Sequence, residues 1–166
     1  MALTIETLAE EKWRQGKVFT FLHSSDSLAI SAKERFVICV GNDPVVLKSL
    51  SIEGDAETLT WEAHSNSEAD EGTGVTLNAI PRNIQASTIP GMIVAVNPTI
   101  TKEGVPFFPL PIQIIGQTAA GNRAYISEDL IDSPFTMLAN TCYTIDVTNN
   151  SDKLVRYDMS FNFWNS

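Results

Sequence analysis

The stretch from Cys142 to Ser166 has the most regular alternation of apolar and polar residues in the chain. Side chains along a β-strand point alternately to opposite faces, so this alternation predicts strands with one buried face. Asn149 to Asp152 separates the two alternating runs, and residues of this kind favour a reversal of the chain. We therefore predict a β-hairpin whose apolar face forms one layer of the core. On its last strand that face comprises Val155, Tyr157, Met159, Phe161 and Phe163.

Shorter apolar runs separated by turn residues recur from Lys17 onward. Val46 to Glu53 and Glu57 to His64 flank Gly54-Asp55 and predict a second hairpin. About ten short strands at nearly even spacing are typical of an all-β sandwich. A jelly roll is a common way to connect eight or more such strands. We predict a jelly-roll-like antiparallel β-sandwich that forms a single domain over residues 17–166.

The N-terminal residues 1–16 predict a short helix or arm. Thr4 can cap a helix that runs to Gln15, and Ile5, Leu8 and Trp13 fall on or near one face. A helix of ~11 residues is marginal alone and needs a surface to pack on. That surface is either its own domain or a neighbouring subunit, and in the second case Trp13 and Arg14 are contact candidates.

Two segments interrupt the strand pattern. Ser65 to Gly74 is acidic and contains two glycines, which predicts a solvated loop, since its oxygens lack the spacing of a calcium loop. Val105 to Pro111 contains three prolines, which cannot donate ladder hydrogen bonds. We expect an edge, a bulge or a crossover there. Phe107 and Phe108 either pack beneath this segment or, if exposed, mark a contact with another chain.

Charge and composition exclude several classes of protein. The chain has 166 residues, a formal charge of −9 and no basic run, so we expect neither nucleic-acid binding nor docking to an anionic membrane. Apolar runs fall short of the ~20 residues needed to cross a bilayer. Glu6, Glu10 and Glu11 interrupt the stretch in which a signal peptide would be apolar, so we expect synthesis in a cytoplasm.

Candidate chemistry is sparse. Cys39 and Cys142 lie in strand-like segments and can pair only if those strands are neighbours; we expect two reduced, buried thiols. His23 and His64, with Glu62, have no spacing typical of a metal site. The sequence contains no nucleophile elbow, zinc-protease helix or phosphate loop. We therefore predict no catalytic, cofactor-binding or metal residues, and no enzymatic activity.

Three stretches, covering about half of the chain, resemble a family of tailed-bacteriophage virion proteins. They are Asn78–Asn83, Val96–Thr101 with Gly104, and Leu138 with Tyr143–Asn149 followed by Phe161–Trp164. These are small β-sandwich proteins of the capsid decoration, cement or head-fibre type. The sequence departs from the family pattern at Pro81 and in Val105–Pro111. The resemblance implies a non-enzymatic virion subunit, trimeric and bound to the capsid lattice.

Two functional hypotheses follow. In the first, the protein binds the major capsid protein or another virion protein at the capsid surface and reinforces the particle. Its contact candidates are Trp13, Arg14, Phe107 and Phe108, because aromatic and Arg side chains dominate interface energetics. In the second, the protein is a receptor- or glycan-binding module of a fibre or tail. Trp61, Trp164 and Asn162 would then contact the sugar, provided that they face outward.

Overall fold

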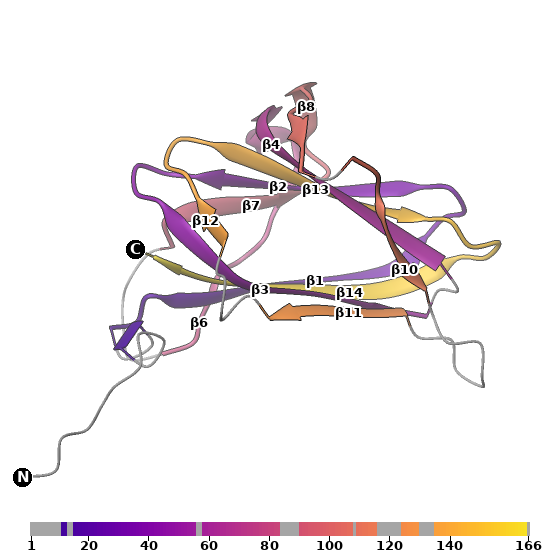
Figure 1. Cartoon of the computed structure of the whole chain (residues 1–166), viewed down its shortest axis with the longest axis horizontal. Coiled ribbons are helices and arrows are strands. Elements are labelled where there is room, and N and C mark those ends of the chain that lie inside the picture. The colour runs from indigo at the N-terminus through magenta and orange to yellow at the C-terminus, as the bar shows by residue number, and fades with distance from the viewer. Residues whose placement is uncertain are drawn as a thin grey trace, which may run out of the picture.

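The computed structural model describes two antiparallel β-sheets packed face to face (Figure 1). It describes residues 11–12, 15–55, 58–83, 90–107, 109–115, 124–129 and 135–165. The six-stranded sheet comprises β1 (Val18–Leu28), β3 (Val45–Gly54), β6 (Ile80–Pro81), β11 (Ala124–Asp129), β12 (Phe135–Met137) and β14 (Val155–Asn165). The eight-stranded sheet comprises β2 (Lys33–Val40), β4 (Thr58–Asp70), β5 (Val75–Thr76), β7 (Met92–Val96), β8 (Thr99–Lys102), β9 (Val105–Pro106), β10 (Ile112–Ile115) and β13 (Cys142–Asn149).

The strand order is that of a jelly roll. Four strands of one sheet follow the order β11-β3-β14-β1, and four of the other follow the order β10-β4-β13-β2. The chain crosses from sheet to sheet along β1, β2, β3 and β4, and again from β13 to β14. Two such sheets with this connectivity make a double-sheet jelly roll. The predicted jelly-roll-like β-sandwich is therefore confirmed.

Both predicted hairpins are wrong. β13 pairs with β2 and β4, whereas β14 pairs with β1 and β3, so the two strands lie in different sheets. β3 and β4 are likewise separated, because β3 pairs with β14 and β4 with β13. Alternation of apolar residues shows which face of a strand is buried. That face is buried whether the two strands pair in one sheet or lie in two facing sheets, so alternation does not distinguish the two arrangements. Here the two apolar faces meet across the sandwich instead of lying side by side.

The side chain of Asn149 holds the connection between β13 and β14. Its amide nitrogen donates to the carbonyl oxygens of Leu28 (3.0 Å) and Lys153 (2.8 Å), and its oxygen accepts from the backbone nitrogen of Ser151 (2.9 Å). Asn149 is fully buried. One side-chain amide thus satisfies backbone groups in the connection from β13 to β14 and at the end of β1. A hairpin turn would not need bonds to a third strand.

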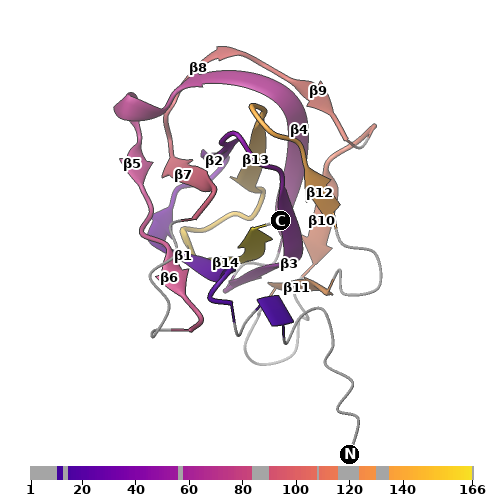
Figure 2. The same cartoon turned by 90° about the vertical axis from the view of Figure 1, so that its left-hand side faces the viewer.

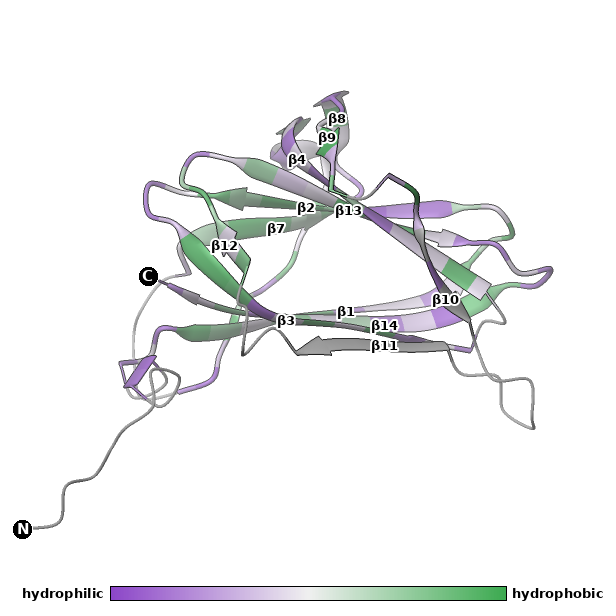
Figure 3. Cartoon of the chain, viewed as in Figure 1, coloured by the Kyte–Doolittle hydropathy of each residue, from purple (hydrophilic) through white to green (hydrophobic). Residues whose placement is uncertain are grey.

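The hydrophobic core fills the space between the sheets. All five apolar residues predicted for the last strand, from Val155 to Phe163, are buried there. They meet Phe19 and Phe21 of the same sheet and Phe36 and Ile38 of the facing one. β7 is hydrophobic along its whole length (Figure 3). Burial of this many large side chains is the main source of stability in a domain of this kind.

Residues 71–111 form an insertion between β4 and β10. It begins with the 3₁₀ turn η1 (Glu71–Thr73), and its strands β8 and β9 pair with the far part of β4 (Figure 2). A Cβ atom on Gly104 would lie 2.1 Å from the carbonyl oxygen of Ser65, so only glycine permits this close approach. The predicted solvated loop at Ser65–Gly74 is wrong in its first part, because β4 continues to Asp70 and gains partners from the insertion.

The predicted N-terminal helix lies mostly outside the described residues. Residues 4–10, 13 and 14 belong to the part that is not described, whereas residues 11 and 12 are helical. The backbone nitrogen of Gln15 donates to the carbonyl oxygen of Glu11 at 2.9 Å. Where the chain is described, no helix has the length and apolarity needed to span a bilayer.

Candidate functional site

The insertion presents an exposed apolar segment at its C-terminal end. Val105, Pro106 and Phe107 are exposed, as are Pro109, Leu110 and Pro111. From Val105 to Ile115 the sequence contains no charged residue. In a chain with 19% charged residues, an uncharged segment with six exposed residues from Val105 to Pro111 is a candidate surface for contact with another molecule. We call it the proline-rich segment, residues 105–111.

Phe107 joins this segment to the sandwich. Its ring stacks on Tyr143 with centroids 6.1 Å apart and meets the edge of Phe135 at 5.2 Å. Its backbone nitrogen donates to the carbonyl oxygen of Ala63 at 2.8 Å. The ring is nevertheless 40% exposed, so Phe107 is neither packed beneath the segment nor fully free. Held by three strands, it presents a pre-ordered aromatic surface that loses little entropy on binding.

Leu138 extends the apolar surface beyond the insertion. It follows β12, is exposed, and its backbone nitrogen donates to the hydroxyl oxygen of Tyr143 at 2.8 Å. Tyr143 thus connects Leu138 on one side with Phe107 on the other. The other three predicted contact residues, Trp13, Arg14 and Phe108, lie outside the described residues.

The residues proposed for glycan binding do not offer a sugar site. Trp61 is 8% exposed and belongs to the core, and Trp164 is 6% exposed. Neither ring presents a flat face on which a sugar could stack. The condition that these tryptophans face outward is not met, because Trp164 is buried even though it lies opposite the apolar face of β14.

Asn162 is committed to neighbouring strands. Its oxygen accepts from the hydroxyl of Thr20 at 2.6 Å, and its amide nitrogen donates to the hydroxyl of Ser49 at 2.8 Å. The side chain therefore bridges β1 and β3 across β14. A sugar hydroxyl would have to displace one of these bonds.

A polar cluster lies between the two sheets near one edge of the sandwich. His23 Nε2 is 3.3 Å from Glu34 Oε2, and the hydroxyl of Tyr157 donates to the same oxygen at 2.5 Å. Burial alone would raise the pKa of Glu34, but the nearby His23 ring and the hydrogen bond from Tyr157 outweigh it and hold that pKa below its usual value. Burial, together with the Glu34 carboxylate, raises the pKa of the Tyr157 hydroxyl.

The surface beside this cluster is a shallow pocket of about 220 Å³, lined by His23, Glu34, Thr73, Gly74, Val75, Val96 and Asn97. Glu34 already accepts from Tyr157 and contacts His23, so it is engaged by the protein's own groups. His64 lies on the outer face of the eight-stranded sheet, with Nδ1 3.4 Å from the hydroxyl of Thr144. The two histidines therefore do not converge on a common site.

A second polar cluster occupies the outer face of the eight-stranded sheet. Asp146, which is fully buried, accepts from Nε and Nη2 of Arg35 at 2.5 Å each and from Nζ of Lys33 at 2.9 Å. Arg35 also donates to Glu103 of the insertion at 2.7 Å. Burial would raise the pKa of Asp146, but the bonds from Arg35 and Lys33 hold it below the usual value. This cluster fastens the insertion to the sheet.

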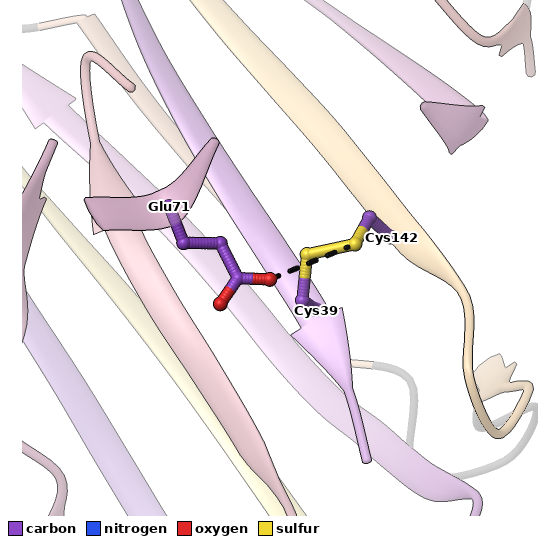
Figure 4. A group of neighbouring side chains, drawn as sticks. All are labelled: Cys39, Glu71 and Cys142. Atoms are coloured by element: carbon purple, nitrogen blue, oxygen red, sulfur yellow. Dashed lines mark hydrogen bonds between the residues drawn. A yellow bond between two sulfur atoms is a disulfide. The ribbon is translucent and has the colours of Figure 1, made fainter. Parts of the chain in front are cut away.

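The two cysteines form a disulfide, contrary to our expectation of reduced thiols. Cys39 and Cys142 are directly opposite each other on β2 and β13, with Cα atoms 4.1 Å apart. The strands are neighbours, which the sequence did not reveal because the bonded residues are 103 positions apart. Glu71 of η1 reaches the same place, with Oε1 3.9 Å from Cys142 Sγ (Figure 4).

Comparisons with known proteins add little to this picture. No protein-family model and no curated protein sequence matches the chain. Among solved structures, a chain of Desmodium yellow mottle tymovirus is similar over 90% of this chain and 87% of its own, with 11% identity and a TM-score of 0.28. A chain from a marine algae virus of the order Picornavirales is similar over 99% and 81%, with 8% identity and a TM-score of 0.24.

A third similar structure is not viral. Eiger TNF from S. frugiperda is similar over 86% of this chain and 90% of its own, with 8% identity and a TM-score of 0.19. Scores this low carry no argument about function. The assignment to a jelly roll rests on strand order and pairing, and that fold serves viral and non-viral proteins alike.

Proposed function

We propose that this protein is a virion structural protein, a bacteriophage head component that binds the assembled capsid surface and reinforces it. The observation that carries the proposal is the exposed, uncharged, proline-rich segment on a rigid sandwich. Its prolines restrict the backbone before binding, and Phe107 is already ordered by Tyr143 and Phe135. Such a surface is suited to adhesion, because little conformational entropy remains to be lost.

Three further features support the proposal. The jelly roll is a fold that viral capsid domains use, although it also occurs in lectins and cupins. The ionisable clusters of Glu34 and Asp146 are engaged by the protein's own groups. The disulfide suits a protein that works outside a reducing cytoplasm, where cellular reductants would otherwise keep cysteines as thiols.

Reinforcement would follow from mass action. A protein that binds the assembled lattice but not free capsid subunits stabilises assembly by an amount that grows with its concentration. In this mechanism the proline-rich segment crosses a junction between copies of the major capsid protein, and the acidic remainder of the surface faces solvent.

We further propose a homotrimer in which Trp13 and Arg14 of the N-terminal arm contact a neighbouring subunit. Native mass spectrometry should then give three times the chain mass.

Co-sedimentation with undecorated capsids tests the proposal. The wild-type protein should pellet with capsids and raise the temperature at which they release DNA. Leu110→Glu should weaken binding at least about tenfold, because it buries a charge in an apolar contact. Leu110 is 75% exposed and flanked by prolines, so the substitution should leave the fold intact. The matched control is Leu22→Glu, on β1 of the other sheet, where the residue is 54% exposed.

Two results would overturn the proposal. One is the absence of wild-type protein from the capsid pellet, together with no gain in heat resistance. The other is equal loss of binding in both variants, which would mean that the proline-rich segment has no special role.

A further inference from the structure

Three potential metal ligands meet on the outer face of the eight-stranded sheet. Cys39 comes from β2, Cys142 from β13 and Glu71 from η1 at the start of the insertion. The two Sγ atoms and a Glu71 carboxylate oxygen all lie within 4.8 Å of one another. Figure 4 shows the carboxylate reaching toward the sulfur atoms from the neighbouring ribbon. Three segments that are far apart in sequence are thus brought to one point.

The contact between Glu71 and Cys142 gains little while the disulfide is intact. Oε1 lies 3.9 Å from Sγ, but a disulfide sulfur carries no hydrogen and cannot donate a bond to the carboxylate. The same three groups would interact strongly if a cation lay between them. Two thiolates and a carboxylate supply three negative charges, and such a set is stable only when a cation or protons neutralise it.

The strand backbones, and not only the disulfide, hold the two sulfur atoms together. β2 and β13 are paired at seven successive positions, from Cys39 opposite Cys142 to Lys33 opposite Thr148. Both strands also have a partner on their other side, β7 for β2 and β4 for β13. Breaking the sulfur–sulfur bond therefore leaves the thiols facing each other. A tetrahedral zinc site needs sulfur atoms about 3.8 Å apart, as follows from Zn–S bonds of ~2.3 Å, and rotation about χ1 can provide that separation.

We propose that reduction of the Cys39–Cys142 disulfide creates a binding site for one thiophilic divalent cation of the Zn²⁺ class, with Cys39, Cys142 and Glu71 as ligands. The reductant is a dithiol. One of its thiolates attacks the sulfur of Cys142, the more exposed cysteine, and forms a mixed disulfide, while the Cys39–Cys142 bond breaks and Cys39 leaves as a thiolate. The second thiol of the reductant then displaces Cys142, so the dithiol becomes a disulfide and the protein gains two thiols. Binding of the cation releases the two thiol protons.

Ligand chemistry selects the class of cation. Thiolates favour Zn²⁺ and its soft relatives, whereas Ca²⁺ and Mg²⁺ require sets of oxygen ligands. Ser67 lies opposite Cys142, and Ile93 lies opposite Cys39 on the far side. The exposed side chain of Ile93 makes that flank of the site apolar. With three protein ligands, the fourth position of a tetrahedral ion is open to water. Cation binding and the disulfide are mutually exclusive, because a sulfur atom in a disulfide cannot be a thiolate.

Titration with Co²⁺ tests this proposal without capsids, so its outcome is independent of the proposed function. The protein is reduced with dithiothreitol, desalted without oxygen and titrated while thiolate-to-cobalt absorption in the near ultraviolet is recorded. We expect one Co²⁺ per chain, displaced by an equivalent of Zn²⁺. The oxidised protein should bind at least about 100-fold more weakly, because it supplies no thiolate.

Three variants separate the ligands from their surroundings. Glu71→Gln should weaken binding at least about tenfold and leave the disulfide able to form. Asp70→Asn, one residue away, should change the affinity by less than about twofold. Cys142→Ser should abolish the charge-transfer band.

The proposal is overturned by absence of the band in the reduced wild-type protein, or by equal affinity of the oxidised form. Unaltered binding by Glu71→Gln would also overturn it, since a ligand would have been misassigned. Circular dichroism of the reduced protein completes the test, because loss of fold that Co²⁺ does not restore contradicts a preformed site.

Discussion

Both faces of β13 are buried at its centre, but they are stabilised in different ways. Ile145 points into the core between the sheets, where burial of apolar surface is the driving force. Asp146, the next residue, points to the outer face and is also fully buried. There the insertion covers the sheet, and a carboxylate is matched by Arg35 and Lys33. The inner face therefore depends on apolar packing, and the outer face depends on matched charges.

The largest losses of stability should appear when these neighbours are each replaced by alanine. Asp146→Ala should lower the free energy of unfolding by about 3–5 kcal/mol, because it removes the buried carboxylate that Arg35 and Lys33 share. Ile145→Ala should cost a similar amount, about 2–5 kcal/mol, through a cavity. Urea unfolding measures both. Asp158→Ala, at an exposed aspartate of β14, serves as the control and should change stability by less than about 0.5 kcal/mol.

A double variant sharpens the comparison. Arg35→Met combined with Asp146→Leu should regain most of the stability that Asp146→Ala loses, because no uncompensated charge remains at that position. A cost below about 1 kcal/mol for Asp146→Ala alone would mean that the outer face behaves as ordinary solvated surface.

The disulfide is the next largest contribution to the outer face. Replacing Cys39 and Cys142 together by serine should lower the free energy of unfolding by about 2–4 kcal/mol, since the bond closes a long loop in the unfolded chain. The 103-residue separation places this bond among those expected to restrict the unfolded state strongly. Urea unfolding of the double variant, compared with the wild-type protein with and without a reductant, measures the effect. No difference among the three samples would show that the strand ladder alone fixes this region.

Acid should weaken both faces, and the pH profile can separate them. Native pKa values of Asp146 and Glu34 are held below their usual values. Their contribution to stability is therefore present above the unfolded pKa, about 4 for both groups, and is lost as pH falls through the native pKa. Stability should drop between about pH 5 and pH 2, by up to ~1.4 kcal/mol per pH unit for each proton taken up.

Asp146→Asn and Glu34→Gln should each reduce the loss of stability between about pH 5 and pH 2. The first removes the contribution of the outer face, and the second removes that of the cluster between the sheets. Thermal unfolding across this pH range compares the two slopes with that of the wild-type protein. A wild-type profile that is level from pH 5 to pH 2 would contradict the assigned hydrogen bonds.

The smallest effect should come from the solvent-exposed edge of the insertion. Lys102 Nζ lies 2.9 Å from Glu68 Oε1, and both side chains are mostly exposed. Lys102→Ala should therefore change the free energy of unfolding by no more than about 1 kcal/mol, with the effect decreasing further in high salt. A cost comparable to that of Asp146→Ala would show that the edge also depends on its charges.

The sequence predicts the buried faces well but not the partners of the strands. The alternation in Val155–Phe163 correctly identifies a core strand, because a period of two fixes which side chains share a face. The same pattern does not show whether a second apolar strand pairs with this strand in one sheet or packs against it from the facing sheet. The turn residues Asn149 to Asp152 therefore predict a hairpin, whereas in the structure the buried amide of Asn149 bonds to Leu28 at the end of β1 and to Lys153 in the crossing between the sheets.

The candidate sites were harder to predict, because they depend on the insertion. The proline-rich surroundings of Phe107 predict a contact candidate, and the structure gives its ring ordered aromatic neighbours. The sequence around Glu71 predicts a solvated loop, since nothing in its local spacing points to Cys142. The available signal was that both cysteines lie within predicted strands. Their distance in sequence gives no indication that these strands are neighbours. Alternation places Trp164 opposite the apolar face of its strand, but it does not show that this opposite face is buried as well.

The pairing of β1 with β14 places the first and last strands side by side, with Phe21 opposite Phe161. β14 is also the neighbour of β3, so the six-stranded sheet lacks a central member until this strand has left the ribosome. Contacts between such remote positions slow folding. Nascent chains halted before Val155 should consequently stay sensitive to proteases, and productive folding should begin only after translation has passed that point.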